Sequence, residues 1–394
     1  MKATIKRSIQ PAARLSQVSE YYFSMKLKEI ARRNANGEDI ISLAIGSPDM
    51  PPSTQTIETL CREARNPSGH GYQPTAGMLE MKDAMAGWYK RWFNVDLDPK
   101  TEIQPLIGSK EGILHVTLTF CNPGDKVLIP DPGYPTYSSL SKILGCEVIK
   151  YDLTAATGWQ PDFDALEAMD LSNVKIMWTN YPNMPTGAPA RNETYERLVA
   201  FALKHGILIV NDNPYSFILG QEHLSIFQVE NAKSCCIEFN SMSKSHNMPG
   251  WRVGMLAANE NFIRWILKIK SNIDNGTFRA IQLAAAEAYR NDDEWHQKYN
   301  VDIYRERRAI AEEIMTALGC TFDPEQVGMF LWGRIPDRYA NVEDLTEKVL
   351  NEAHVFITPG FIFGKNGERY VRISLCAKPE KMKEALERIK QIMN

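Results

Sequence analysis

Short apolar runs alternate with helical stretches between residues 100 and 260, and this alternation limits the possible folds more than any other feature of the chain. Four runs end in polar or turn residues: KVLIP, VKIMWTN, GILIVND and SCCIEFNS. Between the second and third lies an amphipathic helical segment, ETYERLVAFALKH (193–205). Strands that alternate with helices predict an α/β fold with a mainly parallel sheet flanked by helices and right-handed crossovers.

Three of the predicted strands end in a polar residue, Asn180, Asp212 or Ser241. The carboxyl ends of parallel strands lie at one edge of a sheet, and ligands of such folds bind at that edge. The sequence therefore predicts a ligand site that these three residues share.

The pattern changes near residue 285. Long charged helices are followed by the apolar runs HVFITPG and RYVRISLC and then by a last helix rich in Lys and Glu. We interpret this part as a smaller α+β domain. The expected division is an N-terminal segment (1–48) that packs with the small domain, a large domain (49–284) and the small C-terminal domain (285–394).

Composition excludes several classes of function. The chain has 394 residues, 44% of them hydrophobic, and a formal net charge of -3, which disfavours a nucleic-acid partner bound through its phosphates. We expect neither a signal peptide nor a membrane span, because no sufficiently long apolar run occurs. Seven cysteines without a C-x-x-C pair favour a cytoplasmic protein. The histidines have no metal-ligand spacing, so no metal is expected.

Lys244 stands between two serines in SMSKSHNMPGWRVG. An isolated lysine is usually an exposed surface residue. The small neighbours and the rigid Pro249–Gly250 pair favour a lysine in a confined space, whose amine loses its proton readily and forms a Schiff base. His246 lies two residues further on and invites a catalytic interpretation, but a lysine displaced by substrate can move the proton itself.

Ser241 and Arg252 flank this lysine and suit a phosphate, because a hydroxyl and a fixed guanidinium both donate to anions. GSKEG (108–112) begins a predicted helix over residues 110–120, whose free N–H groups would face the same anion. Together these features predict a phosphate cradle.

Asp212, Tyr134 and Arg372 each have a structural and a functional interpretation. Asp212 could cap a helix, or it could face a pyridine nitrogen and keep it protonated, with Tyr215 three residues away. Tyr134 in DPGYPTY could pack in the core or stack on a flat ring. Arg372 lies inside a strand pattern, where its charge is costly unless an anion such as an α-carboxylate pairs with it.

These residues, in this order, resemble the class I/II group of pyridoxal-phosphate (PLP) aminotransferases of fold type I. The resemblance covers nearly the whole chain. It rests on these segments: ISLAIGSPDMPP, GYQPTAGMLEMKDA, GSKEG, DPGYPTY, YPNMPTG, NDNPY, SMSKSHNMPGWRVG, VFITPGFIFG and YVRISL. A shorter segment, EYYFSMKL, is similar to the opening of the diaminopimelate- and alanine-type branch.

The resemblance implies transamination between an L-amino acid and a 2-oxo acid by a two-stage ping-pong reaction, with PLP in the large domain. It implies that Lys244 binds PLP and moves the proton, and that Asp212 pairs with the pyridine nitrogen. Tyr215 would donate to the ring hydroxyl and Tyr134 would stack on the ring.

The same resemblance implies the remaining contacts. Arg372 and the backbone near Gly46 would hold the substrate carboxylate. Tyr72 would reach the phosphate from the neighbouring subunit of a homodimer. The implied phosphate ligands within one chain are Ser109, Lys110, Ser241 and Arg252.

One position departs from the family pattern. The family usually has asparagine immediately before the proline of YPNMPTG, where this chain has Met184. That asparagine donates to the ring oxygen of the cofactor, and a thioether cannot donate. Asn183 or Asn180 is the expected replacement, and Asn183 is counted among the cofactor-binding residues.

Two other functions stay open. A carbon–sulfur β-lyase would use the same scaffold, and a cofactor-sensing transcription regulator would need a DNA-binding domain for which the segment before the first family motif leaves little room. The sequence does not identify the amino donor. Tyr21, Tyr22 and Phe23 could line an apolar pocket or simply pack a helix.

Overall fold

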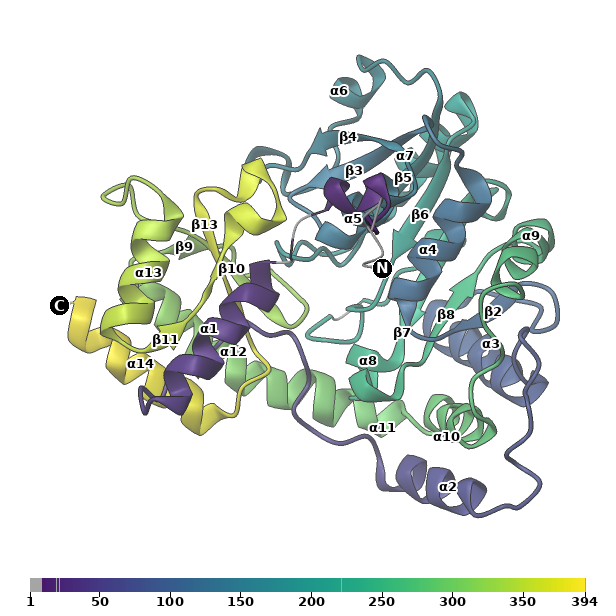
Figure 1. Ribbon diagram of the computed structural model, residues 1–394, viewed down its shortest axis with the longest axis horizontal. Helices are drawn as coiled ribbons and strands as arrows, with labels where there is room; N and C mark the ends of the chain where they lie inside the picture. The colour runs from purple at the N-terminus through teal and green to yellow at the C-terminus, as the bar shows by residue number, and fades with distance from the viewer. Residues whose placement is uncertain (1–8, 19, 21, 221, 394) are drawn as a thin grey trace, which may run out of the picture.

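A seven-stranded sheet forms the centre of the larger part of the molecule (Figure 1). The computed structural model describes residues 9–18, 20, 22–220 and 222–393. The strands, in their order across the sheet, are β2 (Ile103–Leu106), β8 (Gly254–Ala257), β7 (Cys236–Ser241), β6 (Leu208–Asp212), β5 (Val174–Asn180), β3 (Lys126–Asp131) and β4 (Glu147–Asp152). All pairs from β7 to β4 are parallel, which confirms the predicted mainly parallel sheet.

The four predicted runs are strands β3, β5, β6 and β7, and the sequence analysis did not identify the other three. Strand β8 has only four residues and runs antiparallel to both its neighbours, β7 and β2. Strand β2 contains Pro105, which has no N–H to donate, and it lies at an edge of the sheet, where such a residue is tolerated.

Successive residues of these strands enter two different hydrophobic clusters. Val127 and Ile129 face one cluster, while Leu128 between them faces the other. Both faces are covered by helices, and this is why the strands are apolar throughout. The helices of the large part are α2 (Thr54–Ala64), α3 (Leu79–Phe93), α4 (Ser109–Phe120), α5 (Pro135–Ile143), α6 (Phe163–Glu167), α7 (Asn192–His205), α8 (Met242–Ser245), α9 (Glu260–Lys270) and α10 (Arg279–Arg290).

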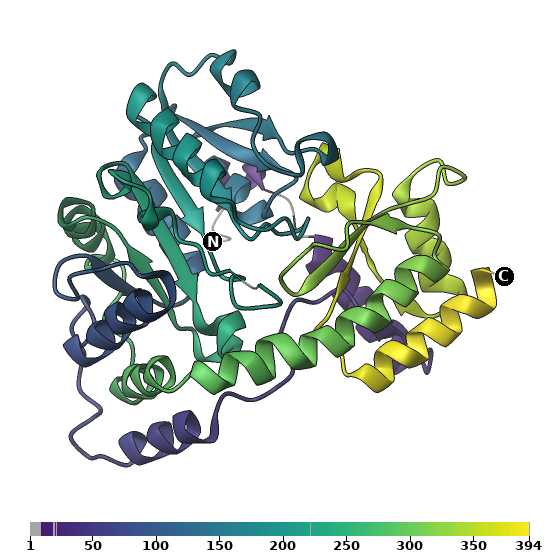
Figure 2. The same ribbon diagram turned by 180° about the vertical axis from the view of Figure 1, so that it is seen from behind.

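The smaller part contains a four-stranded antiparallel sheet in the order β12–β13–β10–β9. Figure 2 shows a long helical segment that runs from beneath the large sheet into this part. The strands are β9 (Thr321–Phe322), β10 (Phe330–Arg334), β12 (Thr358–Pro359) and β13 (Tyr370–Ser374). The helices are α11 (Asp293–Trp295), a π-helix (His296–Asp302), α12 (Ile303–Ala317), α13 (Val342–Glu352) and α14 (Pro379–Met393).

The N-terminal segment contacts the smaller part. Strand β1 (Ile41–Ser42) pairs in parallel with β11 (Val355–Phe356), and Lys26 of α1 (Tyr22–Ala35) forms an ion pair with Glu347 of α13 at 2.7 Å. The expected boundary after residue 284 falls inside α10, which packs on α2 and α3. We therefore propose that the small domain begins nearer Arg290.

No helix in the described part of the chain is both long enough and apolar enough to span a membrane.

Candidate active site

A cavity of about 420 Å³ lies where the carboxyl ends of β5, β6 and β7 face strand β13 of the smaller part. Ten of the twelve predicted site residues line it, and the other two, Asn183 and Tyr72, do not. The ten are Gly46, Ser109, Lys110, Tyr134, Asp212, Tyr215, Ser241, Lys244, Arg252 and Arg372. The sheet thus brings together residues that lie up to 326 positions apart, between Gly46 and Arg372.

Lys244 projects into the cavity from the short helix α8, whose N-cap is Ser241. Its ammonium donates to the carbonyl of Gly46, which lies on the N-terminal segment. Burial lowers the pKa of Lys244, and the charges of Arg372 and Arg252 act in the same direction. A Cβ at position 46 would lie 2.2 Å from the ring of Phe330, so only glycine fits there. Lys244 is therefore an amine that gives up its proton more readily than an exposed lysine does.

The N-terminus of α4 and the residues after β7 form a cradle at one end of the cavity. Ser109 and Lys110 occupy the first turn of α4, and Nη1 of Arg252 lies 3.5 Å from Oγ of Ser243. Gly108 has φ +78°, and a Cβ there would lie 2.1 Å from Nη2 of Arg252. The guanidinium therefore occupies space that only a glycine leaves open. Free N–H groups, hydroxyls and two cations around one point suit a phosphate.

Asp212 ends strand β6 and is 5% exposed. Its Oδ2 accepts a hydrogen bond of 2.8 Å from the hydroxyl of Tyr137, while its Oδ1 is buried and accepts none from any residue that the structure describes. Burial raises the pKa of Asp212 to about 6, against the opposing effect of the Tyr137 hydrogen bond. A buried carboxylate oxygen without a donor is costly. A cationic ring N–H from a ligand in the cavity would supply the missing hydrogen bond to Oδ1.

Tyr137 is a site residue that the sequence analysis missed. It lies in the same DPGYPTY segment as Tyr134, and its ring stacks on Trp178 at 4.9 Å between centroids. The rings of Tyr134 and Tyr137 meet edge to face at 5.5 Å. Burial raises the pKa of Tyr215, so its hydroxyl stays protonated and available as a donor.

Arg372 is 4% exposed and lies among aromatic rings at the other end of the cavity. Its Cζ is 3.9 Å from the ring centre of Phe330, 4.6 Å from that of Phe363 and 5.6 Å from that of Phe23. Nη2 donates to the carbonyl of Ala44 at 2.9 Å. These contacts fix the guanidinium in one position, as bidentate binding of a carboxylate requires.

The two candidate replacements for the missing asparagine differ in position. The side chain of Asn183 turns into its own loop, where Oδ1 accepts from the hydroxyl of Thr186 at 2.7 Å and Nδ2 donates to the carbonyl of Asn180 at 3.2 Å. Asn180 does line the cavity, but its Nδ2 donates to the carbonyl of Asp212 at 2.6 Å and its Oδ1 accepts from the N–H of Met184 at 2.8 Å. Asn183 therefore has no contact with the cavity, and Asn180 is the better candidate.

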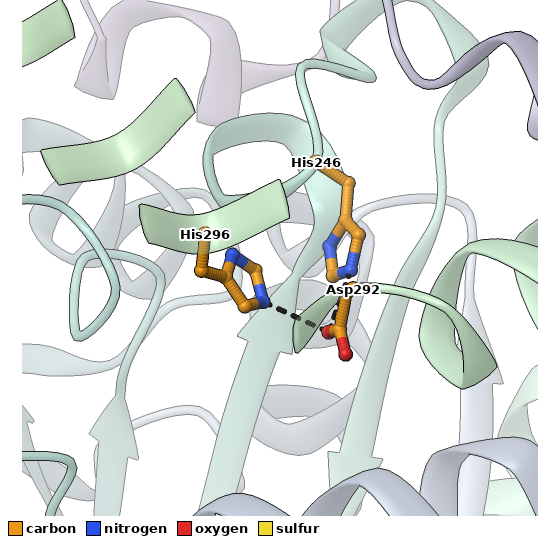
Figure 3. Close-up of side chains that lie close together, drawn as sticks. All are labelled: His246, Asp292 and His296. Carbon is orange, nitrogen blue, oxygen red and sulfur yellow. Dashed lines mark hydrogen bonds and ion pairs between the residues drawn. The ribbon is translucent and has the colours of Figure 1, made fainter. Parts of the chain in front are cut away.

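His246 does not face the cavity. Figure 3 shows that His246 and His296 both point at Asp292, with their Nε2 atoms 3.2 and 2.8 Å from its Oδ2. Burial lowers the pKa of His296 to about 4. The same Oδ2 accepts from the indole of Trp88 at 2.7 Å, and Arg91 forms an ion pair with Oδ1. Protein donors already surround this carboxylate, so the cluster has the character of a structural network.

A second cluster of possible metal ligands contains Glu111, His115 and Asp274. The ammonium of Lys270 forms ion pairs with both carboxylates of this cluster. The lysine therefore supplies the positive charge that a cation would otherwise bring.

Comparison with known proteins shows the family of this chain. A family model described as aminotransferase class I and II matches residues 38–389. The LL-diaminopimelate aminotransferase of Moorella thermoacetica is 40% identical, over 98% of this chain and 99% of its own, and the protein of that name from Aquifex aeolicus is 40% identical over 96% and 98%.

Solved structures give the same result for the fold. A substrate-bound structure of BacF from Bacillus subtilis superimposes with a TM-score of 0.92, at 33% identity over 98% of both chains. An aspartate aminotransferase variant from Thermus thermophilus has a TM-score of 0.90 at 24% identity, over 98% of this chain and 100% of its own, which supports the fold alone.

Proposed function

Since the chain belongs to the class I and II aminotransferases, a PLP-dependent family, and is itself an aminotransferase, we propose that Lys244 is its catalytic residue, in a site that exchanges an amino group between an L-amino acid and a 2-oxo acid. One observation carries the proposal. The cavity holds both Lys244, whose pKa is lowered by burial, and the unpartnered Oδ1 of Asp212. An amine and a buried carboxylate in this relation suit a cofactor that offers a carbonyl carbon and a pyridine nitrogen.

The residues present fit PLP at both of its ends. The cradle of Ser109, Lys110, Ser241 and Arg252 would take the phosphate, with Ser243 as an additional hydroxyl. Asp212 would keep the ring nitrogen protonated, and in that state the bound ring draws negative charge away from the α-carbon of the substrate. Tyr137 holds the carboxylate of Asp212 in place through its hydrogen bond of 2.8 Å.

Tyr134 would stack on the ring, and Tyr215 would donate to the ring oxygen. Arg372 would bind the α-carboxylate of the substrate through its fixed guanidinium. The amino group of the substrate would then lie toward Lys244, whose Nζ would take the proton from the α-carbon. The carbonyl of Gly46 accepts a hydrogen bond from Lys244 and so aims its nitrogen into the cavity.

As part of this proposal, the protein forms a homodimer in which Tyr72 of one copy reaches the active site of the other. Its side chain is 93% exposed and lies outside the cavity of its own chain. An exposed tyrosine in a family motif is well placed to complete the phosphate cradle of a second copy. The seven free cysteines are compatible with the cytoplasmic location expected from the sequence.

The relatives named above make LL-diaminopimelate the first amino donor to assay. A positive assay is a rise in glutamate when the protein receives PLP, LL-diaminopimelate and 2-oxoglutarate. A panel of other amino acids belongs in the same experiment.

The direct test of Lys244 is chemical labelling. Borohydride reduction of the PLP-loaded protein followed by peptide mapping should place the label on the peptide that contains Lys244. Lys244→Ala should abolish both the label and turnover and leave the unfolding transition of the protein in place, while Lys204→Ala, at an exposed position, should change neither. A label on any other lysine would refute the assignment.

A further inference from the structure

Asp131 ends strand β3 and is 3% exposed, but it does not line the cavity. Its carboxylate binds a loop of the smaller part, which crosses to the large sheet just before β13 (Figure 1). Oδ2 accepts from the N–H of Lys365 at 3.1 Å, and Oδ1 accepts from the N–H of Asn366 at 3.0 Å. Gly364 has φ +146°, and a Cβ there would overlap Oδ1 of Asp131, so only glycine lets the loop come this close.

Two further groups join the same segments. Nδ2 of Asn366 donates to the carbonyl of Asp131 at 3.0 Å and to Oδ1 of Asp152, on the neighbouring strand β4, at 2.7 Å. The N–H of Gly133 donates to the carbonyl of Phe363 at 2.9 Å. The loop of residues 363–366 is therefore bound to the end of the large sheet along its length.

Phe363 connects this loop to the active site. It ends the short 3-10 helix η7 (Gly360–Phe363), lines the cavity, and has its ring centre 4.6 Å from Cζ of Arg372. The closer ring, that of Phe330, lies on β10, which pairs with the strand of Arg372 over five residue pairs and is fixed by the sheet. Phe363 lies outside the sheet, so its position depends on what holds its loop. Asp131 is the residue that holds it.

The carboxylate of Asp131 is well suited to this task. A buried charge must keep its donors, and hydrogen bonds to a charged acceptor are stronger than those to a neutral one. Besides the two N–H groups of the loop, Nζ of Lys150 donates to Oδ2 at 2.8 Å. Lys150 belongs to β4 of the same sheet, so this ion pair stays within the large part of the molecule. The two loop N–H groups are what connect the carboxylate to the smaller part.

We propose that Asp131 is a positioning residue for the substrate carboxylate. By holding the 363–366 loop it keeps the ring of Phe363 against Arg372, and the guanidinium stays where it binds the α-carboxylate. The proposal rests on the proposed function, because it takes Arg372 as the carboxylate-binding group. All of the contacts involved lie within one chain, so they do not depend on the neighbouring subunit. Release of the loop should weaken carboxylate binding and leave the cofactor end of the cavity unchanged.

The first test measures carboxylate binding without reaction. Propionate, which has no amino group, is titrated into the PLP-loaded protein by calorimetry. Asp131→Asn keeps the shape of the side chain but loses the charge and turns one acceptor into a donor, which opposes one loop N–H. We expect propionate to bind about tenfold more weakly and PLP to bind as in the wild type. Unchanged propionate binding would overturn the proposal. Weaker PLP binding with unchanged propionate binding would assign the effect to Tyr134 and would overturn it too.

Lys150→Met is the matched control. It removes a partner of the same carboxylate, at a side chain that is 51% exposed, and leaves both loop N–H groups bound. Propionate binding should stay within about twofold of the wild type. A loss as large as that of Asp131→Asn would mean that the charge balance around Asp131, and not the loop, sets carboxylate binding, and would count against the proposal.

Asn366→Ala gives a second measurement that does not disturb the buried carboxylate. Asn366 is partly exposed, and the variant removes its side-chain hydrogen bonds to Asp131 and Asp152 while the backbone N–H remains. We expect propionate to bind about threefold more weakly. If Asp131→Asn does not fold, an unchanged affinity in Asn366→Ala overturns the proposal by itself.

Steady-state kinetics distinguishes positioning from a general loss of structure. Asp131→Asn should raise KM for the amino donor about tenfold and leave kcat nearly unchanged, because the carboxylate is bound in the ground state and in the transition state alike. A fall in kcat with an unchanged KM would contradict the positioning role. If the wild type neither converts an amino acid nor binds propionate, the proposed function fails, and this proposal fails with it. If the wild type does both and the variants match it, only the role of Asp131 is refuted.

Discussion

Sδ of Met184 lies 3.1 Å from Nη1 of Arg372, at the position where the resemblance implies an asparagine whose amide donates to the cofactor. Asn183 does not reach the cavity, and the amide of Asn180 already bonds to two backbone groups. Under the proposed function, Tyr215 would then be the main donor within this chain to the ring oxygen. With few donors, this oxygen would retain more negative charge and would hold a proton shared with the nitrogen of Lys244 more tightly.

Met184→Asn should therefore lower the pH midpoint of the visible absorbance of the PLP-loaded protein. The shift should be about one unit, which corresponds to about 1.4 kcal/mol and to one hydrogen bond to a charged group. The measurement is a titration without substrate, with Met184→Leu as the control for packing. Coincident curves for Met184→Asn and the wild type would mean that Asn180 already acts as the donor.

Asp212 leads to a prediction about stability and pH. Burial raises its pKa from 3.8 to about 6. A raised carboxyl pKa means that the folded protein binds this proton more tightly than the unfolded chain, so stability falls as pH rises from about 4 to about 6 and stays reduced above that. For a difference of about two units the cost is roughly 3 kcal/mol.

Asp212→Asn removes this cost. Without cofactor, the variant should be more stable than the wild type by roughly 2–3 kcal/mol at pH 7.5 and about equally stable at pH 4. Urea denaturation at the two pH values measures the difference, and Asp96→Asn, at an exposed carboxylate, is the matched control. A constant difference between wild type and Asp212→Asn at both pH values would contradict the prediction. Loaded with PLP, the variant should lose most of its activity, because its amide cannot keep the ring nitrogen protonated.

Sequence patterns could predict four of the parallel strands, but not β4, and most of the cavity, because both depend on local signals. Lys244, Asp212 and Arg372 are each marked by a polar residue in an apolar or small-residue setting. Tyr137 shows what such signals miss. Its hydroxyl meets a carboxylate 75 residues away in the chain, and no feature of DPGYPTY indicates which of its two tyrosines does so.

Other features were hidden for different reasons. Strand β8 is too short to show a period, and Pro105 in β2 is a residue that usually argues against a strand. Asn183 was a reasonable donor because it precedes Met184 directly. Its loop, however, turns the side chain toward Thr186, and only the backbone path decides this.

Replacing Arg372 by lysine should weaken transition-state binding by about 2–4 kcal/mol, because the charge remains but the planar fork is lost. The rings of Phe330 and Phe363 pack against the planar guanidinium, and a lysine ammonium does not reproduce these contacts. The loss in kcat/KM should be similar for every amino acid, since all share the α-carboxylate. Arg334→Lys, at a partly exposed arginine on the neighbouring strand, is the control. A loss confined to one substrate would mean that Arg372 reads a side chain.

The last prediction concerns helix α8, which carries Lys244. Nδ2 of Asn300, in the π-helix, donates to the carbonyl of Ser245 at 2.7 Å and contacts Nδ1 of His296 at the same distance. The carbonyl can only accept, so this amide nitrogen is fixed as the donor, and Nδ1 of His296 must be the acceptor. The imidazole is therefore neutral and donates through Nε2 to Asp292.

Asn300→Leu keeps the approximate volume of the side chain but removes both hydrogen bonds and leaves Nδ1 of His296 without a donor. We expect a loss of about 2–4 kcal/mol in stability at pH 7, measured by urea denaturation, and an altered pH midpoint of the cofactor absorbance, because the backbone next to Lys244 loses its anchor. Asn291→Leu makes the same change at an exposed position of the preceding segment, where the amide contacts Glu287 at 2.6 Å, and should alter neither quantity. If both variants behave alike, Asn300 does not position helix α8 and its Lys244. If stability falls and the absorbance midpoint stays fixed, the network around Asp292 supports the fold and not the geometry of Lys244.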